Sequence, residues 1–243
     1  MNLLRTDHAV SIVLPASSGG GLLHIRQIIG IGRNYAEHAK EQGAAVPDRP
    51  MVFTKSPASL ALSGDPIIIP RVCQDQEQVD YEGELGFVIA NPTRDATEAD
   101  ARNPASGIIL GYCVANDVSA RWWQKQGSGG QFYRGKSFDT FCPIGPRIVP
   151  AAEVPDPMNL RLVTTLNAEP VQDARTSDMI FSIANLIADL SRGTTLLPGT
   201  LILTGTPSGV GMGRTPPRYL RAGDKVRIEI EHLGTIENPV TAE

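Results

Sequence analysis

The stretch DYEGELGFVIA (residues 80–90) joins three closely spaced carboxylates to an uninterrupted apolar run. The apolar part, residues 85–90, is typical of a buried β-strand. Asp80, Glu82 and Glu84 lie at alternate positions, and alternate residues of a strand project from one face. Like charges this close repel one another, so such a face is either solvated or neutralised by a cation. A solvated edge strand is the ordinary alternative, but the run into residues 85–90 favours a cation site beside a buried strand.

Similar strand-like runs occur along the whole chain, each bounded by Gly, Pro, Asn or Asp. They cover residues 25–31, 66–70, 107–115, 160–167, 200–205 and 225–234. In the last run Val226, Ile228 and Ile230 alternate with charged residues, which predicts a strand with one buried face. There is no internal repeat or obvious linker, so a single β-rich domain is the simplest interpretation.

Three stretches predict short helices between these strands. Residues 34–42 begin with Asn34 as an N-cap, carry Glu37 three residues later as in a capping box, and stop at Gly43. Residues 117–126 begin with capping residues, Asp117 or Ser119.

The third helix is the only one with a plain packing face. Ser182 caps it, its apolar residues share one side, and it ends before Gly193. Few, short helices among many strands predict a mixed α+β, β-rich fold class.

Composition excludes several classes of protein. The 243 residues carry 22 basic and 26 acidic side chains, a formal charge of −4, which argues against a nucleic-acid or anionic-membrane surface. The 24 glycines and 19 prolines are about 18 % of the chain, against roughly 12 % on average, and this argues against coiled coils and long helical bundles.

The chain lacks an apolar run of about 18 residues, and its start, MNLLRTDHAV, lacks the layout of a signal peptide. We therefore expect a cytoplasmic protein. Cys73, Cys113 and Cys142 are odd in number and widely spaced, which favours reduced thiols. With four histidines and no HxH or HExxH motif, a histidine-based metal site is improbable, so any metal must be held by carboxylates.

Asp117 supplies a further candidate ligand beside the carboxylates of residues 80–84. It follows the apolar run GYCVAN at the junction with the second expected helix, where site residues often gather; the alternative is that it only caps that helix. An oxygen-only donor set with open positions suits Mg²⁺ or Mn²⁺ better than Zn²⁺.

Arg121 and Gln124 follow Asp117 at spacings of four and seven, which would place them on one helix face. A guanidinium binds carboxylates in a bidentate manner, and an amide adds a further hydrogen bond. Together with a metal, this pattern indicates a substrate that carries a carboxylate.

His38 and Glu41 lie three residues apart on the first expected helix, so the carboxylate can orient the imidazole as a general base. Such a pair on a surface helix is more often structural. Here Gly30, Gly32 and Gly43 bracket a short polar helix suited to act as a mobile lid, which favours the catalytic interpretation.

Two glycine-rich strings do not match nucleotide or hydrolase motifs. GIGRNY (residues 30–35) lacks the third glycine of a dinucleotide fingerprint, and GTPSGVGMGR (residues 205–214) lacks the lysine of a P-loop. Ser208 is one position off a nucleophile elbow. The second string is either a tight loop or an anion-binding nest of backbone amides with the Thr206 hydroxyl.

Taken together and in order, these strings resemble the fumarylacetoacetate hydrolase family in its small single-domain form. The similarity runs from about Ile29 to Val240. Its matching pieces are IGIGRNYAEHAKE, PMVFTKSPASL, DYEGELGFVIA, GYCVANDVSARWWQ, RGKSFDTFCPIGP, LILTGTPSGVG and LRAGDKVRIEIEHLGTIEN. GKSFDTFCPIGP and GRTPPRYLRAGDKV resemble most closely the branch called fumarylacetoacetate hydrolase domain-containing proteins.

The resemblance implies a β-roll of mixed sheets, usually homodimeric, and a set of site residues. It implies Mg²⁺ or Mn²⁺ bound by Glu82, Glu84 and Asp117, with Asp80 outside the ligand set. The family pattern assigns the remaining roles as follows: the polar head of the substrate to Lys136 and Thr206, its neighbourhood to Arg121 and Gln124, and the lid dyad that orients water or moves a proton to His38 and Glu41.

The resemblance also implies the reaction class. We expect an enzyme on small 2-oxo or β-dioxo acids acting through a metal-chelated enolate, by acylpyruvate hydrolysis or by oxaloacetate decarboxylation or tautomerisation. Two alternatives stay open: a hydratase or isomerase of aromatic catabolism, acting on a 2-oxopent-4-enoate or 2-oxohept-3-enedioate type of substrate, and a non-catalytic dimeric scaffold. We expect residues 1–28 to be a short N-terminal segment and residues 29–243 the catalytic domain. Since about 28 residues precede the first motif, too few for the separate SH3-like domain of the larger fumarylacetoacetases, we expect fumarylacetoacetate itself to be a less suitable substrate.

Overall fold

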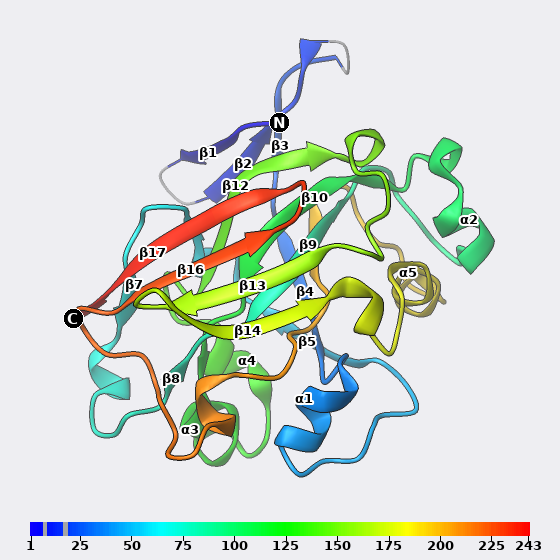
Figure 1. Cartoon of the computed structure of the whole chain (residues 1–243). Helices are drawn as coiled ribbons and strands as arrows, with labels where there is room; N and C mark the ends of the chain where they lie inside the picture. The colour runs from blue at the N-terminus through cyan, green and yellow to red at the C-terminus, as the bar shows by residue number, and fades with distance from the viewer. Residues whose placement is uncertain (7–8, 17–18) are drawn as a thin grey trace.

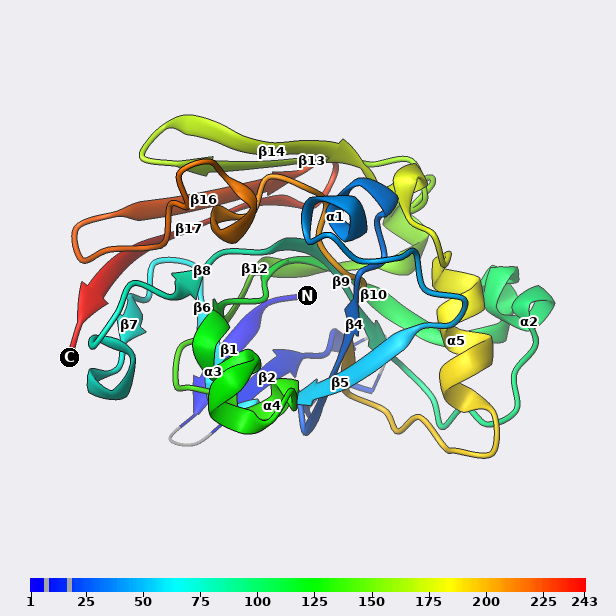
Figure 2. The same cartoon turned by 90° about the horizontal axis from the view of Figure 1, so that it is seen from below.

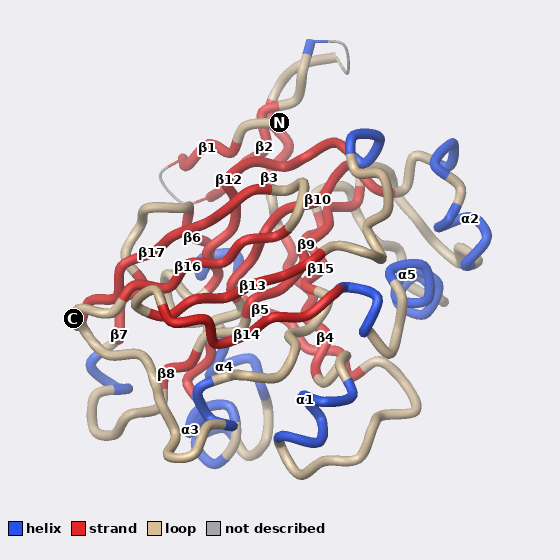
Figure 3. Tube along the Cα trace, in the orientation of Figure 1, coloured by secondary structure: helices blue, strands red, loops and turns tan. Residues whose placement is uncertain are grey.

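The computed structural model describes residues 1–6, 9–16 and 19–243, and strands are its main regular secondary structure (Figure 3). The strands are β1 (Leu3–Thr6), β2 (Ala9–Val13), β3 (Leu22–His24), β4 (Gln27–Gly32), β5 (Met51–Lys55), β6 (Leu60–Leu62), β7 (Ile67–Ile69), β8 (Val79–Asp80), β9 (Gly83–Ile89), β10 (Ile109–Asn116), β11 (Ser119–Ala120), β12 (Cys142–Pro150), β13 (Arg161–Leu166), β14 (Glu169–Arg175), β15 (Thr200–Leu203), β16 (Lys225–Ile230) and β17 (Gly234–Ala242). The α-helices are α1 (Ala36–Glu41), α2 (Glu98–Arg102), α3 (Arg121–Gln124), α4 (Phe132–Lys136) and α5 (Ile183–Ser191).

Two large mixed sheets form the body of the protein (Figure 1). The seven-stranded sheet has the order β5-β4-β15-β9-β10-β12-β6, and the five-stranded sheet the order β14-β13-β16-β17-β7. Most neighbours are antiparallel, while β4–β15, β6–β12 and β7–β17 are parallel. A three-stranded sheet, β1-β2-β3, and the short pair β11-β8 complete the set. This confirms the β-rich, mixed α+β class predicted from the sequence.

The seven-stranded sheet is the middle layer (Figure 2), and its central strands are buried on both faces. Leu85 and Phe87 of β9 join the core shared with the five-stranded sheet, whereas Val88 joins the core shared with the N-terminal strands. Alternate side chains of a strand point to opposite faces, so a strand buried on both sides is apolar throughout. This explains the continuous apolar run of residues 85–89.

Residues 80–90 do not form one strand. β8 ends at Asp80 and pairs with β11, and β9 begins at Gly83 in the seven-stranded sheet, so the chain passes between two sheets at Tyr81 and Glu82. The prediction that Asp80, Glu82 and Glu84 share one strand face is therefore wrong. Gly83 is required at the crossing, because a Cβ there would lie 2.3 Å from Thr164 Oγ1.

Two of the three expected helices are shorter than predicted. α1 has Tyr35 as its N-cap without a side-chain cap bond, because the Asn34 side chain instead donates to Thr204 O (2.8 Å) and Phe181 O (3.0 Å). The helix expected over residues 117–126 is reduced to the single turn of α3, and neither Asp117 nor Ser119 caps it. Local sequence patterns miss such outcomes, since tertiary hydrogen bonds compete for the same polar groups.

The packing helix α5 forms as predicted. The Ser182 hydroxyl accepts a hydrogen bond from Asn185 N, and Leu186 and Ile187 are fully buried. Cys73, Cys113 and Cys142 are free and buried. Among the described helices, none has the length and apolarity needed to cross a membrane.

Candidate active site

Three buried carboxylates meet where β9 begins and β10 ends. Glu82, Glu84 and Asp117 can each present an oxygen within 4.8 Å of the others. The two segments are locked together, because Glu82 N donates to Asn116 Oδ1 (3.0 Å) and Asp117 N donates to Glu82 O (2.9 Å). The fold therefore brings together the three residues that the sequence analysis selected as metal ligands.

Three buried cations surround this triad. Lys136 Nζ lies 2.6 Å from Glu82 Oε2 and 2.5 Å from Asp117 Oδ2. Lys55 Nζ donates to Asp117 Oδ1 at 2.6 Å. Arg121 Nη1 donates to Glu82 Oε1 at 2.6 Å. All three cationic side chains are at most 4 % exposed, so these ion pairs are shielded from water.

The carboxylates are unequally compensated. Burial alone would raise the pKa of Glu82, but Lys136 and Arg121 lower it below its usual range. Burial, together with the charges of Asp117 and Glu82, raises the pKa of Glu84 well above its usual value. Among the described residues no lysine or arginine lies within 4.0 Å of Glu84, and the one hydrogen-bond donor to it is Gly205 N at 2.7 Å.

This imbalance fits a bound metal ion. With Asp80, four buried carboxylates face three buried cationic side chains, so the cluster has an excess of negative charge. Buried charge without a partner is costly, and a donor set made only of carboxylate oxygens suits a hard divalent cation. The residues present are therefore appropriate for a divalent metal held by Glu82, Glu84 and Asp117.

Asp80 has a different set of partners. It accepts hydrogen bonds from Gly211 N (2.7 Å) and Met212 N (3.0 Å), and its Oδ2 lies 2.9 Å from Arg121 Nε. A Cβ at Gly211 would lie 2.6 Å from Asp80 Oδ1, so glycine permits this close approach. Asp80 therefore anchors the loop after Thr206 to Arg121, and it is not part of the carboxylate triad.

Arg121 and Gln124 lie together, but for a different reason from the one predicted. Asp117 is not in the helix, and the two side chains meet within α3, where Arg121 Nη1 also donates to Gln124 Oε1 (3.1 Å). Arg121 is engaged by Asp80 and Glu82, whereas Gln124 lines the cavity described next. In this structure Arg121 orients carboxylates of the chain itself.

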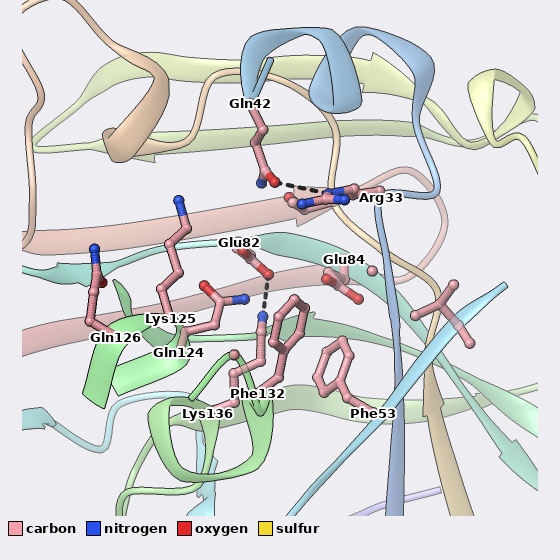
Figure 4. Close-up of a pocket in the computed structure, with 14 residues that line it drawn as sticks. Arg33, Gln42, Phe53, Glu82, Glu84, Gln124, Lys125, Gln126, Phe132 and Lys136 are labelled. Carbon is pink, nitrogen blue, oxygen red and sulfur yellow. Dashed lines mark hydrogen bonds and ion pairs between the residues drawn. The ribbon is translucent and has the colours of Figure 1, made fainter. Parts of the chain in front are cut away.

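A cavity of about 430 Å³ opens beside the triad, and ends of several elements line it (Figure 4). Glu82, Glu84 and Lys136 contribute its polar floor, and Phe53 and Phe132 lie beside them. Lys136 Nζ lies 4.7 Å from the centre of the Phe53 ring, a cation–π contact. The cavity therefore offers an apolar wall next to a strongly charged floor.

Thr206 lies at the edge of this cavity and is hydrogen-bonded to the backbone at the start of β9. Its hydroxyl donates to Gly83 O (2.9 Å) and accepts from Gln172 Nε2 (2.8 Å). The neighbouring loop reaches over to α1, because Gly209 N donates to Glu41 Oε1 at 2.9 Å. The loop after β15 thus contacts both the carboxylate cluster and the helix expected to act as a lid.

His38 forms the predicted pair with Glu41 on α1. Its Nδ1 lies 3.1 Å from Glu41 Oε2, and its Nε2 lies 2.8 Å from the Gln42 side-chain nitrogen. With the amide donating to Nε2, the proton of a neutral imidazole sits on Nδ1 and points to Glu41. His38 is 3 % exposed and is covered by Gln42, which lines the cavity.

The sequence analysis missed five residues of this site. Two are the buried Lys55 that pairs with Asp117 and the aromatic Phe53; the others are Phe132, Arg33 and Gln42, which line the cavity. The only signal for Lys55 was a charge at the end of the strand-like run MVFTK. Nothing local marks Gln42 or Phe132, because their positions depend on how α1 and α4 pack.

Comparisons with known proteins identify the family of the chain. The family model described as fumarylacetoacetate (FAA) hydrolase C-terminal matches residues 27–241. Oxaloacetate tautomerase fahd2, mitochondrial, from Xenopus laevis is 46 % identical over 88 % of the chain, and oxaloacetate tautomerase YisK from Bacillus subtilis is 45 % identical over 88 %. The chain spans 65 % and 69 % of the lengths of these two relatives.

Solved structures give the same assignment. A putative HpcE protein from Mycobacterium smegmatis superposes with a TM-score of 0.86 at 32 % identity, covering 100 % of this chain and 99 % of that one. Fumarylacetoacetate hydrolase from Exiguobacterium antarcticum gives a TM-score of 0.80 at 40 % identity, covering 92 % and 79 %. The predictions of the family, of its fold and of an enzyme are confirmed: the chain belongs to the fumarylacetoacetate hydrolase family.

Proposed function

We propose that the protein is a divalent-metal-dependent enzyme that interconverts the enol and keto forms of oxaloacetate. The observation that carries the proposal is the buried triad of Glu82, Glu84 and Asp117 at the floor of a cavity, with a negative charge that the surrounding cations do not balance. The two relatives at 45 and 46 % identity are both named oxaloacetate tautomerases, which supports the choice of reaction.

Each part of the site has a role in this reaction. A Mg²⁺ or Mn²⁺ ion held by the triad would supply Lewis-acid stabilisation of the developing enolate. Lys136, already placed between Glu82 and Asp117, offsets the charge of the substrate's 1-carboxylate. Gln124, which lines the same cavity, positions the polar head by a hydrogen bond from its amide, and Thr206 does so when its hydroxyl proton turns from Gly83 O to the substrate.

His38 carries the proton. Its unprotonated Nε2 accepts the hydroxyl proton of the enol once the Gln42 amide turns away, and the imidazolium then delivers a proton to C3, which restores the neutral ring. Glu41 stabilises the charged ring through Nδ1 (3.1 Å). Because Glu41 is also held by Gly209 N, the His38–Glu41 pair is fixed relative to the loop after β15 that borders the cavity.

A specific finding favours a second candidate within the same chemistry. A solved structure named 2-hydroxyhepta-2,4-diene-1,7-dioate isomerase, from Mycobacterium marinum, is 39 % identical with a TM-score of 0.75, covering 93 % of this chain and 79 % of that one. Its substrate, by name, is also the enol form of a dicarboxylic 2-oxo acid. Acylpyruvate hydrolysis and oxaloacetate decarboxylation remain further proposals, since both begin from the same chelated head.

The assembly and location stay predictions. We propose a homodimer, which sedimentation at micromolar concentration tests, and a cytoplasmic location. We also propose residues 29–243 as the catalytic domain, with residues 1–28 as a short segment that adds the strands β1, β2 and β3 and the first two residues of β4.

The test is a tautomerase assay with enol-oxaloacetate in Mg²⁺, in Mn²⁺ and in EDTA. We expect His38→Asn to lower kcat by at least about 100-fold, because a positioned base contributes roughly 10²- to 10⁴-fold. His232→Asn, the same change at an exposed histidine, is the matched control.

Metal binding is measured in parallel as the rise in melting temperature with Mg²⁺ and oxalate, an enolate mimic, and we expect it to persist in His38→Asn. An unchanged kcat in that variant would show that His38 is not the base of the reaction. If the parent protein is inactive on oxaloacetate, the same panel run with acetylpyruvate, fumarylpyruvate and the diene-dioate separates the remaining reactions from a non-catalytic scaffold.

A further inference from the structure

Two cationic side chains face the upper part of the cavity, away from the carboxylate floor. Arg33 extends from the turn between β4 and α1, and Lys125 from the end of α3, and both line the cavity (Figure 4). In the part of the chain that the structure describes, neither has an acidic oxygen within 4.0 Å. They are therefore free to bind an anion that enters the cavity.

Arg33 is held in place by its backbone. Its φ of 54° is in the left-handed region, which residues with a Cβ adopt rarely. The following residue, Asn34, is fixed by hydrogen bonds to Thr204 O (2.8 Å) and Phe181 O (3.0 Å). The guanidinium is steered as well, since Nε donates to Gln42 Oε1 at 3.3 Å. This leaves both Nη groups for another acceptor.

Lys125 has no comparable partner. Among the described residues its Nζ has one contact, with Met212 Sδ at 3.4 Å, and a thioether is a weak acceptor. Burial and the nearby charges of Arg121 and Arg33 lower its pKa. Because Lys125 and Arg33 line the same cavity, an anion bound there would offset the charge of both.

The cavity is thus bipolar. At its floor the triad suits a metal and, through it, the chelating head of a 2-oxo acid. At the other end, the side chains of Arg33 and Lys125 can bind a negatively charged group. A monocarboxylic 2-oxo acid satisfies only the floor. A dicarboxylic acid satisfies both ends.

We propose that Arg33 and Lys125 form the subsite that binds the distal carboxylate of a dicarboxylic 2-oxo acid and so determine the preference of the enzyme for dicarboxylates. The inference rests on the proposed function for the chelated head. It adds the residues that recognise the other end. Gln42 links this subsite to the base, because the one amide accepts from Arg33 and donates to His38.

The test compares two stable ligands that differ only at the distal group. N-oxalylglycine carries an oxalyl head and a distal carboxylate; N-ethyloxamate has the same head and a methyl group in place of the carboxylate. Calorimetric titration of the Mg²⁺-loaded protein gives both affinities, and oxalate, which has the head alone, reports on the floor. We expect the parent to bind N-oxalylglycine at least tenfold more tightly than N-ethyloxamate.

Arg33→Met should remove most of this tenfold preference, and Arg33→Lys should keep part of it. Lys125→Met should reduce the preference both as a single variant and when combined with Arg33→Met. The affinity for oxalate should stay within twofold in each variant, which shows that the fold and the floor are intact. Lys40→Met, at an exposed lysine of α1, is the matched control. If Arg33→Met misfolds, Lys125→Met and Arg33→Lys carry the test.

An equal preference in the parent and in both methionine variants overturns the subsite. Because these ligands are not turned over, the result does not depend on tautomerase activity. A protein inactive on oxaloacetate that still distinguishes the two ligands through Arg33 would refute the proposed reaction and retain the subsite. In an active enzyme, the loss in Arg33→Met should also appear as a raised KM for oxaloacetate.

Discussion

Glu84 differs from the other two carboxylates of the triad in its neighbours. Glu82 pairs with Lys136 and Arg121, and Asp117 pairs with Lys55 and Lys136. For Glu84, no lysine or arginine of the described ranges lies within 4.0 Å. A buried, unpaired charge is unfavourable for folding. Glu84 therefore lowers the free energy of unfolding of the metal-free protein, and a bound cation would reverse this effect.

Glu84→Gln should therefore stabilise the metal-free protein while weakening metal binding. The amide keeps an oxygen for Gly205 N and removes the repulsion, and we expect a gain of about 1–2 kcal/mol in the free energy of unfolding. Urea unfolding in EDTA measures it. Glu82→Gln is the control with the opposite sign, because it leaves Lys136 and Arg121 under-compensated. A loss of stability in Glu84→Gln would contradict the charge balance argued here.

At the scale of elements, short segments are fixed by their tertiary contacts. α1 has six residues, too few for a helix that is stable alone. Glu41 ties it to Gly209, and Ile180 N donates to Asn34 O at 2.8 Å. The turn before β16 is fixed by Asp224, which accepts from Arg221 N, Arg218 and Asn167 at 2.7 Å each. Such contacts make element stability depend on distant residues.

The Asp224 turn predicts a pH dependence of stability. Burial alone raises the pKa of Asp224, but its hydrogen bonds with Arg218 and Asn167 lower it below its usual value. A depressed pKa in the folded state gives stability that is present above the unfolded pKa of about 4 and is lost as the pH falls further. Asp224→Asn should cost about 1–3 kcal/mol at pH 7.

The difference between Asp224→Asn and the parent should shrink when the same urea titration is repeated at pH 3. An equal difference at both values would mean that the charge of Asp224 does not contribute. Asp95→Asn, at an exposed aspartate of a loop, serves as the control.

At the scale of the molecule, the active site lies where the layers meet. The seven-stranded sheet supplies Glu84, Lys55 and the end of β10, while α3 and α4 bring Arg121 and Lys136 to the same end (Figure 2). A ligand of the triad therefore bridges segments that are far apart in sequence. Binding to the folded state alone must raise the stability of the whole protein.

Metal removal tests this at the same scale. With free Mg²⁺ at 100 times its Kd, the stabilisation is about 2.7 kcal/mol, and for a protein of this size each kcal/mol shifts Tm by about 2–4 °C. We expect Tm to fall by about 5–10 °C when EDTA replaces Mg²⁺, and oxalate to raise Tm only when the metal is present. Scanning calorimetry measures both. Identical melting curves in Mg²⁺ and in EDTA would contradict the proposed metal site.

The sequence alone determined the family, the β-rich class and the carboxylate triad. Apolar runs bounded by turn residues identify strands whichever strands they pair with. A carboxylate cluster beside a buried run is costly to bury in any fold, and this indicates a cation site. The boundaries were less predictable: Asn34 and Asp117 both had the pattern of helix caps, yet each uses its polar group in a long-range contact.

Only the tertiary structure decided how the charges are shared and what the cavity recognises. Lys55 and Lys136 lie far apart along the chain, yet both bind Asp117. Arg33 and Lys125 likewise meet at one cavity. Such pairings follow from how sheets and short helices pack, because electrostatic and hydrogen-bond energies depend on distance in space and not on spacing in the chain.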